Sequence, residues 1–250
     1  SGGILLMLDD LYARHEKVAL MFSGGRDSLA CLHLTQPYWE QTTVVWVNPQ
    51  ANFPEIESVM QAVREIVPHF LEVTTDQPAS IEQFGYPVDL LPVDWTAMGQ
   101  VSTKPKTIML RSYLDCCSEN KSLPADRAAR DAGCTAIIRG SRSDEMHHSV
   151  VKSGFVHEGV EYCHPLQTWT FGDVLNFLRE RGVDITPRLM LSESSLDCWN
   201  CTAFLADRRE RLVYIKERHP EVYAHLVPLL KEVRNAALRP MADLESILEV

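Results

Sequence analysis

Four cysteine residues are the part of this chain whose type and spacing point most directly to chemistry. Cys116 and Cys117 are adjacent, and Cys198 and Cys201 form a Cys-x-x-Cys after 80 intervening residues (198 − 117 − 1). This spacing suits four thiolates that converge on a cubane 4Fe-4S cluster. The alternative is zinc on Cys198 and Cys201, with the adjacent pair merely buried. Directly adjacent cysteines suit tetrahedral zinc poorly, so we favour iron–sulfur.

A short loop near the start of the chain has the composition of a phosphate-binding turn. Residues 23–28 read Ser-Gly-Gly-Arg-Asp-Ser, between a strand-length apolar run and a segment with helical spacing. Two glycines let backbone N–H groups approach an anion, serine hydroxyls can donate hydrogen bonds, and the helix turns its positive N-terminus to the same point. The Gly-Lys-Ser/Thr ending of a Walker A loop is missing, so transfer of a terminal phosphoryl group is not expected. The alternative is an ordinary glycine-rich turn.

The apolar pattern around these residues alternates between strand and helix. Strands are expected over residues 18–22, 43–47, 70–74 and 135–139, and helices over 27–34, 55–67, 125–132 and 173–181. This alternation predicts an α/β fold with a mostly parallel sheet flanked by helices. Residues 202–250 have helical spacing with a break at Pro220, which predicts a helical C-terminal tail.

The composition favours one large domain with a helical appendage, since the 250 residues are 45% hydrophobic and 23% charged. A net charge of −10 argues against a broad basic surface for duplex DNA, although a groove lined by Arg and Lys can still take a strand. Seven irregularly spaced cysteines indicate reduced thiols, and Cys31, Cys134 and Cys163 are expected in the core. No apolar run reaches 18 residues, so no membrane span is expected and a cytoplasmic location is predicted.

Taken together, these residues resemble the PP-loop ATP pyrophosphatase superfamily, whose Ser-Gly-Gly-x-Asp-Ser loop follows the first strand of a Rossmann-like sheet (the adenine nucleotide alpha hydrolase-like fold). Within it, the chain from about Lys17 to Cys201 resembles the phosphoadenosine phosphosulfate (PAPS) reductase family. The further matching segments are Phe53-Pro54-Glu55, Lys121 with Pro124, Gly140-Ser141-Arg142, and Pro165 to Trp169 leading into Asp173-Val174. The cysteine arrangement resembles that of assimilatory adenylyl-sulfate reductases, where it binds a 4Fe-4S cluster.

The resemblance implies a role for each matching residue. ATP or a related adenine nucleotide would have its anionic end held by Ser23, Gly24, Gly25, Asp27, Ser28 and Gly140. Arg142 would add a guanidinium fork to the same anion, with an ion pair as the alternative. Lys121 would lie near both cluster and nucleotide, unless it is a solvated lysine. Asp27 is also a candidate ligand for Mg²⁺ on the phosphates, with a helix cap as the alternative.

The chain departs from the reductase pattern after Cys201. Sulfonucleotide reductases attack with a cysteine in a Glu-Cys-Gly-Leu-His type motif, and residues 202–250 contain no cysteine. We therefore expect an ATP pyrophosphatase or sulfurtransferase type of enzyme that acts on tRNA, on the DNA backbone or on another acceptor. The alternatives are a reductase that takes its thiol from a partner, and a non-catalytic nucleotide-binding regulatory module. A sulfur donor or thiol-reductant protein is the expected partner, and the sequence leaves the oligomeric state open.

Three regions follow: an N-terminal helix over 1–15, whose residues 1–3 look like a cloning remnant, a PP-loop domain with the cluster site over 16–201, and a helical extension over 202–250. Three other segments are ambiguous. His147 and His148 suggest a mobile substrate loop more than a metal site, and residues 85–92 are either a substrate-facing loop or a packed connector. Residues 208–211, Arg-Arg-Glu-Arg, are expected on the solvated face of a helix, or else in a positive groove for nucleic acid.

Overall fold

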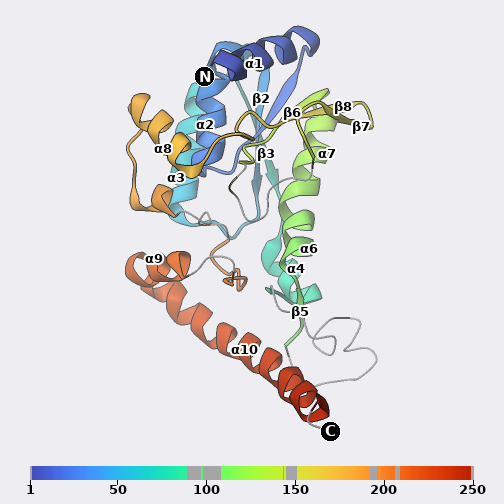
Figure 1. Ribbon diagram of the computed structural model, residues 1–250, viewed down its shortest axis with the longest axis vertical. Coiled ribbons are helices and arrows are strands. Elements are labelled where there is room, and N and C mark those ends of the chain that lie inside the picture. The colour runs from blue at the N-terminus through green and yellow to red at the C-terminus, as the bar shows by residue number, and fades with distance from the viewer. Residues whose placement is uncertain are drawn as a thin grey trace.

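The computed structural model of the protein (Figure 1) describes residues 2–88, 97, 108–142, 144, 151–191, 196, 198–205 and 209–248. A six-stranded sheet lies at its centre, with the strand order β3-β2-β1-β6-β8-β7. Its strands are β1 (Val18–Met21), β2 (Thr42–Asn48), β3 (His69–Thr74), β6 (Ala136–Ile138), β7 (Phe155–His157) and β8 (Val160–Cys163). The first five strands in this order are parallel, and β7 pairs antiparallel with β8 at the edge. The expected α/β fold with a mostly parallel sheet is confirmed.

Helices cover both faces of this sheet (Figure 1). They are α1 (Gly2–Arg14), α2 (Arg26–Leu34), α3 (Pro54–Ile66), α7 (Leu123–Asp131) and α8 (Phe171–Glu180). Successive side chains of a strand point to opposite faces. Val18 and Leu20 of β1 accordingly join the larger core with α1, α2, α3 and α8, whereas Ala19 joins the smaller core with α7. Because both faces are covered, the central strand is apolar throughout.

Most of the remaining elements lie in the lower half of the molecule in Figure 1, but the turn over residues 36–41 lies beside α1, where Tyr38 stacks on Tyr12. They are the 3-10 turns η1 (Gln36–Gln41) and η4 (Pro187–Met190), helices α4 (Gln77–Phe84) and α6 (Tyr113–Cys117), the π-helical turn η3 (Ser118–Ser122), and a small parallel sheet of β4 (Tyr86–Val88) and β5 (Leu110–Ser112). Helices α9 (Glu210–Arg218) and α10 (Pro220–Leu248) form the expected helical tail. Helix α9 packs through Ile215 into a third core that contains Phe53, and α10 reaches Leu110 of β5 through Ala236.

The sequence pattern placed the expected strands and helices to within two residues at either end. It missed the short strands β4, β5, β7 and β8, and α1 begins at Gly2, inside the supposed remnant. Strand β7 has three exposed residues, so it lacks the apolar run that would reveal it. Cys31, Cys134 and Cys163 are buried, as expected. None of the helices in the described ranges is long and apolar enough to cross a membrane.

Candidate functional site

One cavity lies at the carboxyl edge of the sheet, beside β1 and β6. The chain leaves β1 for β2 on one side, while β6 occupies the other side, so this is the topological switch point where open α/β sheets bind ligands. The cavity has a volume of about 490 Å³, which lies within the usual range for small-molecule sites. Its lining includes Ser23, Gly25, Asp27, Ser28, Lys121, Gly140 and all four cysteines, Cys116, Cys117, Cys198 and Cys201. Two predicted residues, Gly24 and Arg142, do not line it.

The loop between β1 and α2 is held in shape by its own residues. Gly24 has a φ of +76°, a backbone conformation that favours glycine, and a Cβ there would lie 3.1 Å from the Met60 side chain of α3. The hydroxyl oxygens of Ser23 and Ser28 lie 3.3 Å apart, and the Ser28 hydroxyl donates to the Gly25 carbonyl oxygen (3.0 Å). Arg188 Nη1 donates to the Gly24 carbonyl oxygen (2.8 Å) and braces the loop from outside the cavity. These contacts hold the loop before α2 in one shape, so the N-terminus of α2 and the loop together form a preformed turn.

Asp27 and Arg142 form a buried ion pair. Arg142 Nη1 lies 2.6 Å from each carboxylate oxygen of Asp27, and its Nε donates to Asp144 (2.8 Å). The Arg142 side chain is 2% exposed. Its guanidinium therefore pairs with two carboxylates, whereas the sequence predicted that it would bind the anionic end of the nucleotide. Asp27 does not cap α2, because Gly25 is the N-cap residue. A magnesium ion at Asp27 would have to displace Arg142, so the geometry does not fit that role.

Gly140 is the position where the segment after β6 touches the start of α2. A Cβ on Gly140 would lie 2.9 Å from the backbone carbonyl carbon of Asp27 and 3.1 Å from its oxygen. Only a residue without a side chain allows this approach. The glycine therefore brings the two walls of the cavity together and sets Arg142 within reach of Asp27.

The Cys-x-x-Cys segment is attached to the sheet domain through its backbone. Cys198 forms an antiparallel bridge with Asn52, and the Trp199 N–H donates to the Ala51 carbonyl oxygen (2.9 Å). A few residues later the Thr202 hydroxyl donates to the Pro87 carbonyl oxygen (2.6 Å). These contacts bring residues far apart in the sequence to the wall that faces α6, where the other two cysteines lie.

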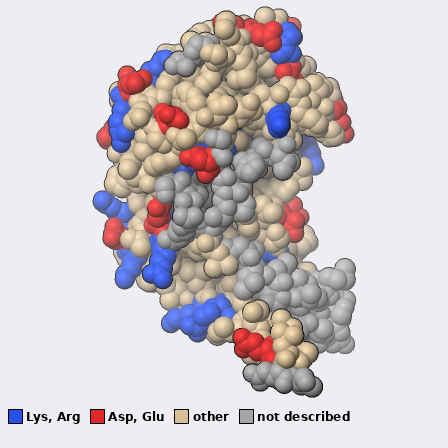
Figure 2. Space-filling model, in the orientation of Figure 1, with Lys and Arg blue, Asp and Glu red and all other residues tan. Residues whose placement is uncertain are grey.

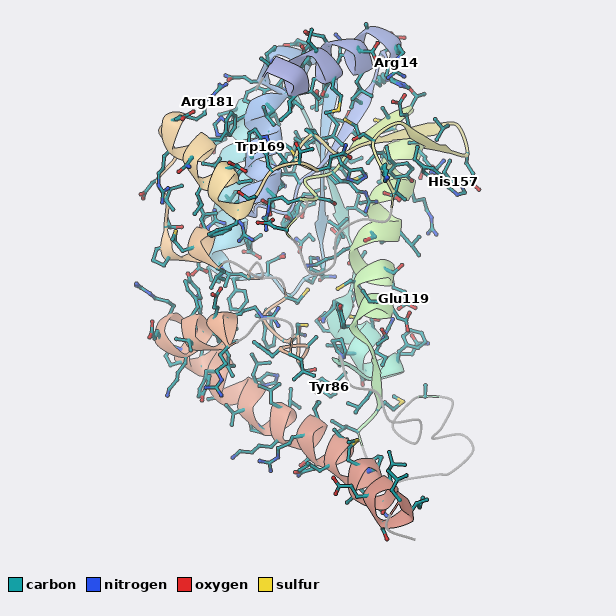
Figure 3. All side chains as sticks on the ribbon, viewed as in Figure 1. Arg14, Tyr86, Glu119, His157, Trp169 and Arg181 are labelled. Atoms are coloured by element: carbon teal, nitrogen blue, oxygen red, sulfur yellow. The ribbon has the colours of Figure 1, made fainter. Side chains whose placement is uncertain are left out.

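Polar donors surround the Cys116 thiol. Burial raises its pKa, while the charges of Arg111 and Lys121 lower it and that of Cys201 raises it. Asn120 Nδ2 lies 3.7 Å from the sulfur, and the Gln77 side chain also hydrogen-bonds to it. Lys121 lines the same cavity as the thiols and the loop over residues 23–28, and its expected place between cluster and nucleotide stays a prediction. Arg111 is itself paired with Glu119 (2.8 Å), which Figure 3 labels beside the green helical segment.

The four thiols that line the cavity are of the type that an iron–sulfur cluster requires. Across the described ranges, no three His, Cys, Asp or Glu side chains lie close enough to hold one metal ion. A cluster is larger than an ion and takes its four thiolates from around its periphery. Four thiols on one cavity, with N–H donors beside Cys116, supply those groups. His147 and His148 lie outside the described residues, as do residues 89–92.

Three arginines that the sequence reasoning did not place in the site also line the cavity: Arg26, Arg139 and Arg211. Arg211 was expected on a solvated helix face or else in a positive groove; it is 2% exposed and donates to the Ala203 carbonyl oxygen (2.9 Å). Its guanidinium lies over the Phe204 ring, 4.1 Å from the centroid. The signal was present in the sequence, because Ile215 follows four residues later on the same buried helix face. Arg209 lies outside the helix, as its N-cap, and Arg208 is not among the described residues.

Comparison with known proteins places this geometry in a family. The model of the phosphoadenosine phosphosulfate reductase domain matches residues 17–204. The chain belongs to this family. The PAPS reductase domain thus spans the sheet, the phosphate loop and all four cysteines, whereas Arg211, α9 and α10 lie beyond it.

A solved structure shares the fold. The chain is similar to the crystal structure of phosphoadenylyl-sulfate (PAPS) reductase from Candida auris in a phosphate complex, with a TM-score of 0.54 and 15% sequence identity. The similarity covers 78% of this chain and 88% of that one. No curated protein matches the chain significantly.

Proposed function

We propose that this member of the PAPS reductase family is an iron–sulfur enzyme that binds ATP or a related adenine nucleotide and acts in sulfur transfer. One observation carries the proposal: a single cavity is lined both by the phosphate loop and by the four cysteines. A nucleotide held by the loop would present its reactive phosphate to the thiol end of the same space. Seven free thiols suit a reducing compartment, which supports a cytoplasmic location.

Nucleotide binding would rest on the N-terminus of α2 and the charges around it. The backbone N–H groups after Ser23 and the two serine hydroxyls would hold the phosphates. Arg26 and Arg139 line the same region and would balance the negative charge. Mg²⁺ on the phosphates stays a prediction, with its ligands supplied by the nucleotide and water in place of Asp27.

Cys116, Cys117, Cys198 and Cys201 would hold a 4Fe-4S cluster. Such a cluster would hold or position the incoming sulfur. The cavity residues contribute what surrounds it: Lys121 and Arg211 place positive charge at the thiol end, and Asn120 and Gln77 orient Cys116.

The C-terminal region favours sulfur transfer over reduction. The wall beside the Cys-x-x-Cys is completed by α9, which contributes Arg211, and no cysteine occurs among residues 202–250. In the proposed reaction an oxygen of the acceptor attacks the α-phosphate of ATP, and pyrophosphate leaves. A sulfur nucleophile then displaces AMP from the activated atom, so the acceptor exchanges oxygen for sulfur. Pyrophosphate and AMP are the expected products.

Nucleic acid is our first choice of acceptor. Basic side chains gather over α9 and the middle of α10 on the face seen in Figure 2. The exposed basic residues of these two helices include Lys216, Arg218, Lys231 and Arg234. Positive side chains of this kind can hold a phosphate backbone beside the cavity even on an acidic protein.

A second candidate is a PAPS or adenylyl-sulfate reductase that takes its nucleophilic thiol from a partner protein. The family match and the fold shared with a PAPS reductase favour it. In that reaction a partner thiolate attacks the sulfur of the nucleotide, the nucleotide phosphate leaves, and a second thiol releases sulfite as a disulfide forms.

Two assays on the anaerobically purified protein separate these functions. One incubates it with ATP, Mg²⁺, labelled sulfide and either bulk tRNA or duplex DNA, and measures pyrophosphate and label on the nucleic acid. The other supplies adenylyl sulfate or PAPS with thioredoxin and measures sulfite. Sulfur transfer predicts the first signal without the second, and sulfite alone would overturn it. Nucleotide binding without either product would indicate a regulatory module.

The cluster is tested separately by iron and sulfide analysis. Cys117→Ser is expected to lose most of the iron, whereas Cys134→Ser, in the smaller core away from the cavity, is the matched control and should keep it. Equal iron in both variants would contradict the assignment of the cluster ligands.

A further inference from the structure

A carbonyl oxygen of the phosphate loop is bound from outside the cavity. Arg188 Nη1 donates to the Gly24 carbonyl oxygen over 2.8 Å, and neither residue lines the cavity. Ser23 and Gly25, on either side of Gly24, do line it. Arg188 therefore contacts the loop on the side away from the space where the phosphates would lie.

This hydrogen bond fixes the direction of an N–H group. The Gly24 carbonyl and the Gly25 N–H belong to one peptide unit, and in a planar trans peptide these two groups point in opposite directions. Because the oxygen is held on the outer side, the N–H is presented to the cavity. The Gly25 nitrogen accordingly lies 3.4 Å from the hydroxyl oxygen of Ser23, which lines the cavity. A hydrogen bond of this length is weak, so an anion can replace it.

The same peptide unit can turn over unless a contact holds it. It joins two glycines, and glycine adopts positive φ about as readily as negative φ. Gly25 has a φ of −75°, and reversal of the peptide would carry it to a positive φ that glycine tolerates. The reversed unit would turn the Gly24 oxygen toward the phosphates and remove one N–H donor. Arg188 makes this reversal costly, because it would break a charge-assisted hydrogen bond.

Arg188 is able to hold the loop because its own turn is anchored. It lies in η4, where Leu189 is 2% exposed and donates its N–H to the Thr186 carbonyl oxygen (2.9 Å). In the opposite direction Arg26, the first residue of α2, donates to the Leu191 carbonyl oxygen. The phosphate loop region and the η4 region thus exchange one arginine hydrogen bond in each direction.

An acidic residue and the C-terminal extension form the surroundings of Arg188. Burial lowers the pKa of Arg188, and the nearby charges of Tyr214 and Glu55 raise it. Glu55, in the first turn of α3, accepts a hydrogen bond from the Tyr214 hydroxyl (3.1 Å) and lies 2.8 Å from His219 Nε2. Tyr214 and His219 lie beyond the matched family domain, which ends at residue 204. The extension therefore helps to form the environment of a residue that holds the phosphate loop.

We propose that Arg188 is a positioning residue for nucleotide binding, and that it holds the peptide between Gly24 and Gly25 in the orientation that offers its N–H to the phosphates. This role rests on the proposed function, because it assumes that the loop binds the phosphates of a nucleotide. Arg188 would not touch the nucleotide, since it does not line the cavity. Its loss should therefore weaken binding of the phosphates and spare binding of the nucleoside.

Isothermal titration with ATP, and competition of adenosine against ATP, test this. Arg188→Met should weaken ATP binding about tenfold and leave adenosine binding unchanged, because it removes a charged hydrogen-bond donor from the loop. Arg188→Lys should recover most of the loss, since an ammonium can donate to the same oxygen. Arg179→Met is the matched control, because Arg179 is exposed in the last turn of α8. Equal ATP affinity of Arg188→Met and Arg179→Met, or equal losses for ATP and adenosine, would overturn the proposal.

Ionic strength separates the orientation of the peptide from a simple effect of charge. Salt screens the attraction between an arginine and distant phosphates, so a loss caused by charge alone would shrink from about 0.1 M to about 0.5 M salt. The ratio of the dissociation constants of Arg188→Met and wild type should instead stay near tenfold, and a ratio that falls to one would refute the positioning role. A wild-type protein that does not bind ATP would refute the proposed function, and this role with it.

Discussion

Gly140→Ala offers a sharp test of how the two walls of the cavity meet. The added Cβ would lie 2.9 Å from the backbone carbonyl carbon of Asp27 and 3.1 Å from its oxygen. Backbone atoms cannot swing aside like a flexible side chain. The first turn of α2 cannot retreat either, because Ala30 and Cys31 behind it are fully buried.

Overpacking of this kind typically costs about 1–3 kcal/mol of unfolding free energy. For a chain of this size that corresponds to a fall in Tm of about 3–10 °C. The displaced α2 also moves the N–H groups that face the phosphates, so nucleotide affinity should fall by about tenfold, equal to about 1.4 kcal/mol. Urea unfolding measures the first effect and isothermal titration with ATP the second.

Gly172→Ala is the matched control. Gly172 lies in the first turn of α8, and its nearest neighbour, the Thr170 hydroxyl, would be 3.7 Å from the new Cβ. Alanine is the better helix former, so this variant should be neutral or more stable by up to about 1 kcal/mol. If Gly140→Ala unfolds and binds ATP like Gly172→Ala, the close approach does not set the geometry of the site.

Three further outcomes are expected. Hydrogen bonds from Arg14 lower the pKa of Glu161 to about 2, so its stabilising effect is complete above the ordinary carboxyl pKa and is lost as pH falls toward 2. Glu161→Gln should therefore lower the free energy of unfolding by about 2 kcal/mol at neutral pH, allowing for the exposure of Arg14, and by almost nothing near pH 2. Urea unfolding of both proteins at the two pH values measures this difference. A difference that stays constant between the two pH values would contradict the prediction. Thr170→Ala removes one half of the capping box of α8 and should lower the free energy of unfolding by about 1 kcal/mol, whereas Thr170→Ser should stay close to wild type. Thermal unfolding of the three proteins measures this. Arg211→Gln should weaken ATP binding about tenfold, because it removes a positive charge from the cavity lining. Arg218→Gln, exposed on the same helix, should leave ATP binding unchanged, and equal titration curves for the two variants would remove Arg211 from the site.

The fold was predictable because its main elements are recorded in local patterns. The apolar run of β1, the glycine turn and the spacing of α2 are contiguous, and the buried strands β1, β2 and β6 were found, although the short buried strand β8 was not. The edge strand β7 was missed because Phe155, Val156 and His157 are all exposed, so burial did not shape its composition. A pattern based on burial finds the centre of a sheet better than its margin.

The residues that share the cavity were largely predictable from the sequence, but the contacts among them were less so. The four cysteines and the phosphate loop share a cavity, as their types suggested, because parallel strands bring their carboxyl ends to one edge. Arg142 and Asp27 are 115 positions apart in the sequence. A local sequence pattern does not indicate which of several carboxylates an arginine pairs with in the folded protein. Arg211 was misjudged because its charged neighbours suggested solvent, while the Phe204 ring and the third core bury it.

The anchoring of the Cys-x-x-Cys segment has a consequence for maturation. Its main chain is tied to Ala51, Asn52 and Pro87, so its shape does not depend on bonds between sulfur and iron. A zinc finger, by contrast, collapses when its ion is removed. The proposed cluster would therefore be added to a polypeptide that has already folded, and oxidative loss of that cluster would leave the folded segment in place for reassembly.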